Sequence, residues 1–153
     1  MDSYDYPRLI AAACEALPEV EDRVQVDVLV QVVDPEYNQI WLVFDEGTYV
    51  IHGRVGSEYL GIEPAETPAI DERRKGIRME RHEPFAQFVG RRLVQARMLG
   101  EAWNGHGFEF TFEGLTDFTM LIQSIYSSPK PDGAEDCLRL GVGHYRCGTE
   151  DAV

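Results

Sequence analysis

The sequence predicts a single α+β domain, residues 1–153, built on an antiparallel sheet of six to eight strands with short helices packed on it. Three observations support this fold class. Several segments alternate apolar and polar residues as half-buried strands do, and short turns rich in Gly, Asn and Asp separate them. A third observation is that the pattern of the first half returns in the second, which suggests an internal repeat. A partly open β-barrel is the alternative architecture.

A first helix is predicted over residues 6–17. Pro7 stands at its start, where the missing N–H of proline costs nothing, and Pro18 is expected to end it. Ala13 and Leu17 belong to an apolar stripe at helical spacing, so this short amphipathic helix needs a sheet to lie on.

Three strands follow in the first half and complete a helix-plus-meander unit, residues 6–55. Valines at every second position from Val24 to Val32 predict a strand over 24–33 with all of them on one face. A loop is expected over 34–38, a second strand over 40–44 and a third over 48–55. Gly47 can supply the positive φ that the turn between the last two strands needs.

Residues 56–83 form a charged, irregular link between the two units, because glycines and prolines interrupt it. Residues 59–62 are expected to add a short strand, and the part after Ile70 reads as a mobile loop. That loop carries a cluster of cations: Arg73, Arg74, Lys75, Arg78 and Arg81. The cluster is either a contact site for an acidic partner or a means of neutralising the acidic halves of the chain.

The second unit is predicted over residues 84–126. Phe85, Phe88 and Val89 share one face of a short helix over 84–90 that Gly90 ends, and a strand over 93–102 follows. A strand with three phenylalanines on one face and a strand over 118–126 complete the meander. Aligned at their glycine turns, the two units, about seventy residues apart, match in one set of core positions: Ile40, Leu42 and Phe44 with Phe108, Phe110 and Phe112. A last strand is expected over 137–145, and the acidic tail 148–153 is expected to be disordered.

The composition restricts the classes of function. The net charge of −13 at pH 7 disfavours binding to nucleic acid or an anionic membrane and favours a basic protein partner. No apolar run is long enough for a membrane span, and the N-terminus lacks the features of a signal peptide. Three cysteines cannot form a disulfide framework and fit a reducing compartment, so we expect a cytoplasmic protein.

Few residues are candidates for chemistry. Cys137, His144 and Cys147 lack the close spacing of zinc ligands, so neither a metal nor another cofactor is expected. Glu109 and Glu113 share one face of a strand at roughly 13 Å, too far apart for a direct acid–base pair.

Two further side chains are candidates for binding. His106 lies in a glycine-flanked turn and is expected to be exposed and able to move. Trp41 alternates with core residues on a strand, so either that face is covered or Trp41 marks a binding surface. The candidate binding residues are therefore Trp41, His106, Glu109 and Glu113, and no catalytic residue is assigned.

These observations favour a small acidic protein-binding module, such as an inhibitor or immunity-type protein that acts on a basic partner without catalysis. A small-molecule-binding domain or hydrolase-like enzyme with a site near His106, Glu109 and Glu113 is one alternative. A structural, homo-oligomerising module is the other.

Overall fold

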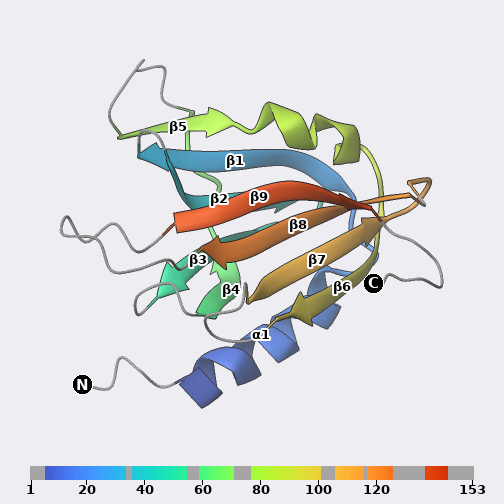
Figure 1. The fold of residues 1–153 in the computed structure, drawn as a ribbon. Coiled ribbons are helices and arrows are strands. Elements are labelled where there is room, and N and C mark those ends of the chain that lie inside the picture. Colours follow the sequence, from blue (N-terminus) through green and yellow to red (C-terminus); the bar gives the residue numbers. More distant parts are fainter. Residues whose placement is uncertain are drawn as a thin grey trace.

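Two layers of antiparallel strands curl around one core and form a half-open barrel, with few helices (Figure 1). The computed structural model describes residues 6–33, 36–54, 59–70, 77–100, 106–115, 117–125 and 137–144. The nine strands of the described residues exceed the predicted six to eight. The antiparallel sheet and the short helices are compatible with the predicted α+β class, and the curled shape with the half-open barrel.

The back sheet runs in the order β4-β3-β2-β1-β5, and every pair is antiparallel. Its strands are β1 (Gln25–Val33), β2 (Glu36–Phe44), β3 (Gly47–Arg54), β4 (Tyr59–Ala65) and β5 (Ile77–Arg81). The front sheet runs in the order β6-β7-β8-β9. Its strands are β6 (Leu93–Leu99), β7 (Gly107–Phe112), β8 (Phe118–Ile125) and β9 (Cys137–His144).

The two sheets meet at two places. Tyr37 of β2 pairs with Leu138 of β9, and Val24 forms a bridge with Arg92 next to the starts of β1 and β6. Helix α1 (Tyr6–Val20) packs against β4 and β6 along one open side of the barrel. The short 3-10 helix η2 (Glu83–Phe88) packs against β1 at the other side.

The alternating apolar residues of both sheets point into this core, as their period of two requires. Phe108, Phe110 and Phe112 are buried, as predicted, and so are Ile40, Leu42 and Phe44. Burying each such side chain contributes about 1.5–3 kcal/mol relative to leaving it exposed, so this ladder carries much of the stability of the fold.

Several predicted boundaries are wrong. Helix α1 continues through Pro18 to Val20, so the proline lies in the last turn and does not end the helix as predicted. Residues 36–38 belong to β2 and not to a loop, since Tyr37 pairs with Val32. The basic segment contains strand β5, and Val89 lies exposed beyond the end of η2. Gly90 and Gly47 have the expected positive φ values, 87° and 124°.

The predicted face of the first strand is wrong at one end. Val26 is a bulge residue, because Gln25 pairs with Phe44 and Asp27 with Val43. The bulge reverses the alternation, so Gln25 is buried and Val26 is exposed. The repeat of two helix-plus-meander units stays a prediction. The predicted tail 148–153 and the end of the last strand lie outside the described residues.

Candidate functional site

The candidate site is built on a short two-stranded ribbon that closes the barrel between β1 and β6. Four backbone hydrogen bonds join residues 22–25 to residues 90–93. The N–H groups of Asp22 and Leu93 donate to the carbonyls of Leu93 and Arg23 at 2.7 and 2.8 Å. The N–H groups of Gly90 and Gln25 donate to the carbonyls of Gln25 and Arg91 at 2.7 and 3.0 Å. We call residues 22–25 and 90–93 the closure ribbon.

Exposed valines gather around the closure ribbon. Among the described residues four large hydrophobic side chains are exposed, and three of them adjoin the ribbon: Val26 at 48%, Val89 at 40% and Val94 at 49%. Val26 and Val94 are both bulge residues, since the register shifts between Gln25 and Asp27 and again between Leu93 and Gln95. A bulge turns a side chain away from the core, and these two valines therefore face solvent.

Acidic turns border the same surface. Asp45 accepts a hydrogen bond from the N–H of Val24, and the N–H of Glu113 donates to the carbonyl of Arg92. The surface therefore combines exposed valines with charged residues, and protein interfaces combine such groups. We call its exposed acidic residues the acidic rim: Asp22, Asp45, Glu46 and Glu113.

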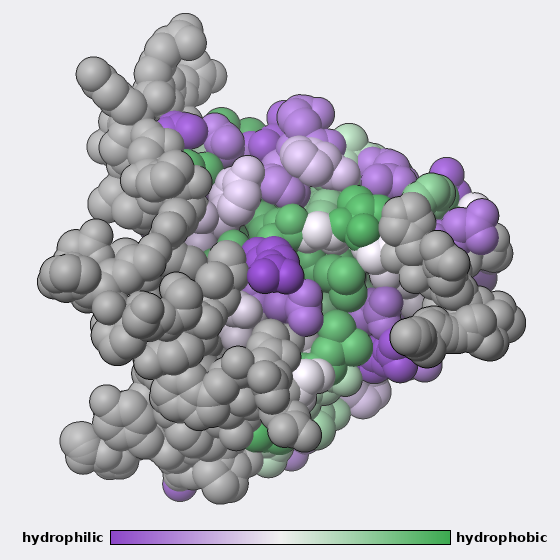
Figure 2. Space-filling model, viewed as in Figure 1, coloured by the Kyte–Doolittle hydropathy of each residue, from purple (hydrophilic) through white to green (hydrophobic). Residues whose placement is uncertain are grey.

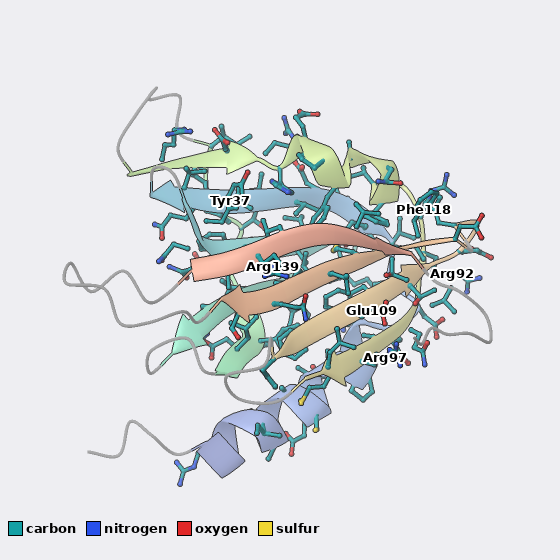
Figure 3. All side chains as sticks on the ribbon, viewed as in Figure 1. Tyr37, Arg92, Arg97, Glu109, Phe118 and Arg139 are labelled. Atoms are coloured by element: carbon teal, nitrogen blue, oxygen red, sulfur yellow. The ribbon has the colours of Figure 1, made fainter. Side chains whose placement is uncertain are left out.

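Three arginines tie the rim together. Arg23 donates to the carbonyl of Glu46 and Arg91 to that of Glu113, at 2.7 and 3.2 Å. Arg92 binds the carboxylate of Glu113 at 2.9 Å and lies 3.7 Å from that of Asp22. Figure 3 labels Arg92. Arg92 lowers the pKa of Glu113, chiefly through this hydrogen bond. Glu113, predicted on a strand, thus lies in the turn after β7.

Glu109, the second predicted carboxylate, lies on the outer face of the front sheet. Arg97 binds its carboxylate at 2.6 Å and the hydroxyl of Thr119 donates to it at 2.7 Å. Figure 3 shows Arg97 and Glu109 side by side on β6 and β7. These partners cover Glu109 so well that its side chain is only 12% exposed. Its polar contacts make it part of the sheet's structure.

His106 is buried, contrary to the expectation of an exposed, mobile side chain. Only 1% of its surface is accessible, and its Nδ1 accepts a hydrogen bond from the N–H of Leu60 on β4 at 3.0 Å. Burial lowers its pKa to about 4. The reason is that residue 106 continues the inward-facing series of β7, where its ring contacts that of Phe108. His106 and Glu109 therefore lie on opposite faces of the front sheet.

Trp41 lies half-buried on the outer face of the back sheet. Its cross-strand neighbours are Leu29 and Val50, and both are buried although they point away from the core. The start of the β4–β5 connection reaches this face, where the hydroxyl of Thr67 contacts that of Thr48. The burial of Leu29 and Val50 favours a covered face over an open binding surface at Trp41.

The described part of the basic cluster is paired within the chain. Arg81 binds Asp27 at 2.9 Å and Arg78 binds Glu80 at 3.1 Å. These two arginines match the self-neutralising alternative, whereas Arg73, Arg74 and Lys75 lie outside the described residues.

Neither a metal centre nor a membrane helix is visible in the described ranges. No three His, Cys, Asp or Glu side chains there are grouped so that they could hold a metal ion. Cys147 lies outside those ranges, as do the side chains of Cys137 and His144. None of the helices there combines the length and apolar character that crossing a bilayer requires.

Sequence reasoning missed the exposed valines of the closure ribbon. The strict alternation of valines from Val24 to Val32 predicts Val26 inside, and Gln25 beside it fits the same alternation, so no local signal marks the change of phase.

The chain matches no protein-family model, no curated protein and no solved structure.

Proposed function

We propose that this protein is a small acidic binding module that docks on a basic protein partner through the surface around the closure ribbon. The exposed valines Val26, Val89 and Val94 support the proposal most directly, since a stable interface needs apolar side chains that it can bury. The four predicted site residues do not meet in one place, so the geometry gives the enzyme alternative no support.

The charge of the chain determines the kind of partner we propose. A net charge of −13 repels acidic molecules and speeds encounter with basic ones, an effect that weakens as salt is added. An inhibitor or immunity-type role directed against a basic protein is compatible with the same property, and we propose the cytoplasm as its location. Such a role needs no catalytic group.

A capture experiment tests the proposal. The tagged protein is incubated with lysate of the source organism at low and high salt, and the bound proteins are identified by mass spectrometry. The proposal requires a basic protein that is retained at low salt and released at high salt. It also requires that Val26→Lys combined with Val94→Lys weakens this binding.

Ile70→Lys is the matched control, because Ile70 is the fourth exposed large hydrophobic residue of the described chain and lies outside the ribbon. An unchanged yield from the double variant, or an acidic captured protein, contradicts the proposal. Capture of a second copy of this chain alone favours the oligomerising alternative.

We also propose that the two halves form a pseudo-twofold repeat, β1–β4 with β6–β9. The strand registers support it. Gln25 pairs with Phe44 as Leu93 pairs with Phe112, and both pairs are followed by a bulged valine. The later strands also correspond: Ile51 pairs with Ile62 as Ile122 pairs with Leu140.

The bonds of the closure ribbon fit the same symmetry. The ribbon contains two pairs of equivalent hydrogen bonds. One pair is the bond from Asp22 to Leu93 and the bond from Gly90 to Gln25. The other pair is the bond from Leu93 to Arg23 and the bond from Gln25 to Arg91. Asp22 and Gly90, which are equivalent positions, both have positive φ. A crystal structure in which β1–β4 fails to superpose on β6–β9 would refute the repeat.

A further inference from the structure

The outer face of the front sheet is a second surface, separate from the closure ribbon. Register places Arg97, Glu109, Leu121 and Gly141 in one row across β6, β7, β8 and β9. Thr119 belongs to the neighbouring row on the same face. These residues alternate with the core residues of their strands, so their side chains point away from the core.

Matched registers give this row a counterpart on the back sheet. The counterpart consists of Leu29, Trp41, Val50 and Glu63. Leu29 and Val50 are buried there, and part of the cover is a segment of the same chain: residues 66–70 leave β4 without regular structure, and Thr67 contacts Thr48. Thr48 is the counterpart of Thr119, because each occupies the same register position in the third strand of its half.

The front face has no such cover among the described residues. Leu121 and Gln123 are half-buried, Arg139 is exposed, and Figure 2 shows hydrophobic residues in the middle of this face. At Gly141 an added Cβ would meet no atom within 4 Å, so the front face is open at this position. The equivalent position of the back sheet carries Glu63. A partly apolar outer face of a sheet can accommodate an extended chain.

The charges of the face select the occupant. Arg97 already binds Glu109 through its Nε and Nη2 atoms, so these two charges offset each other, and Arg139 on β9 is exposed. The charges of Arg97, Glu109 and Arg139 therefore leave a positive excess on this face, although the chain is acidic overall. The segment on the back sheet, Glu66-Thr-Pro-Ala-Ile70, is itself acidic, and its proline favours an extended backbone.

We propose that the outer face of the front sheet binds an extended, acidic segment of a partner protein. The segment lies over Leu121 and Gly141 as residues 66–70 lie over part of the back sheet, and a carboxylate of the segment pairs with Arg139. A guanidinium group suits this role because it binds a carboxylate through two parallel hydrogen bonds.

A display library of random linear peptides tests the proposal with the full-length protein as bait. Selection on the wild-type chain, with counter-selection on Gly141→Trp, is expected to enrich acidic sequences. A selected peptide should bind the variant at least about tenfold more weakly, because the indole covers the open position. In nuclear magnetic resonance titrations its largest shifts should fall on Leu121, Gln123 and Gly141.

Gly141→Ala is the control for the fold, since a methyl group in open space leaves most of the face free. The peptide should bind this variant and the Val26→Lys, Val94→Lys double variant as it binds the wild type, which separates this face from the closure ribbon. Enrichment of basic sequences, or equal binding to Gly141→Trp, overturns the proposal, and so does a library that yields no peptide.

Discussion

At the scale of single residues, two side chains with the same chemistry have opposite surroundings. Glu109 is covered by Arg97 and Thr119, and the hydroxyl of Thr119 is itself buried. Glu113 pairs with Arg92 in an exposed turn. An exposed ion pair contributes about 0–1 kcal/mol because water screens it, whereas a buried hydrogen bond to a carboxylate is costly to break.

Glu109→Ala should therefore lower the free energy of unfolding by about 1–3 kcal/mol, because the buried hydroxyl of Thr119 loses its acceptor. Glu113→Ala should change it by less than about 0.5 kcal/mol. Urea denaturation of both variants measures the difference. Equal effects of the two substitutions would mean that Glu109 is an ordinary solvated side chain.

His106 makes stability depend on pH. Its folded-state pKa of about 4 lies below the ordinary value of 6.5, so between these values the unfolded chain takes up a proton that the folded chain does not. Stability from this residue is complete above pH 6.5 and is lost as the pH falls toward 4, on the order of 3 kcal/mol in total. His82, whose pKa is also lowered by burial, acts in the same direction.

His106→Gln removes the titration and keeps an acceptor for the N–H of Leu60. We expect a smaller loss of unfolding free energy between pH 7 and pH 4.5 in this variant than in the wild type, measured by urea denaturation at each pH. The same loss in both proteins would show that His106 is not buried as the structure has it.

At the scale of elements, the closure ribbon depends on backbone conformations that most residues avoid. Gly90 has φ 87° and Asp22 has φ 75°. Left-handed conformations cost a residue with a side chain about 1–2 kcal/mol, and glycine pays little of this cost. Gly90 thus has a reason to be glycine although a Cβ there would meet no atom within 4 Å.

Gly90→Ala should destabilise the fold by about 1 kcal/mol or more, through backbone strain alone. Gly141→Ala is the matched control, since it too adds a methyl group in open space but has no positive φ. It should leave stability unchanged or raise it by up to about 1 kcal/mol. Thermal denaturation of the pair tests this, and equal melting temperatures would count against the conformation of Gly90.

The sequence predicted elements well where a strand alternates without interruption. The phenylalanines of β7 are buried as their spacing required, and the glycine turns lie where expected. It failed where tertiary structure shifts the phase: the bulge at Val26 follows from closure of the barrel against residues 90–93, which no local pattern encodes. For the same reason His106 is buried against Leu60, although glycines flank it in the sequence.

At the scale of the whole molecule, the fold turns two meanders toward each other and leaves their bulged valines on one end. Val26 and Val94 come from different halves and flank the two ends of the same ribbon. The net charge of −13 acts over the entire surface, and it should raise the association rate with a basic partner at low salt. The exposed valines should instead determine how slowly the complex dissociates.

Docking at the closure ribbon is tested most directly by affinities measured at several salt concentrations. The captured basic partner is titrated with the wild type and with the Val26→Lys, Val94→Lys double variant. We expect binding that weakens with salt and is at least about tenfold weaker for the double variant, while Ile70→Lys binds as the wild type does. Equal affinities of the wild type and the double variant would contradict docking at the closure ribbon.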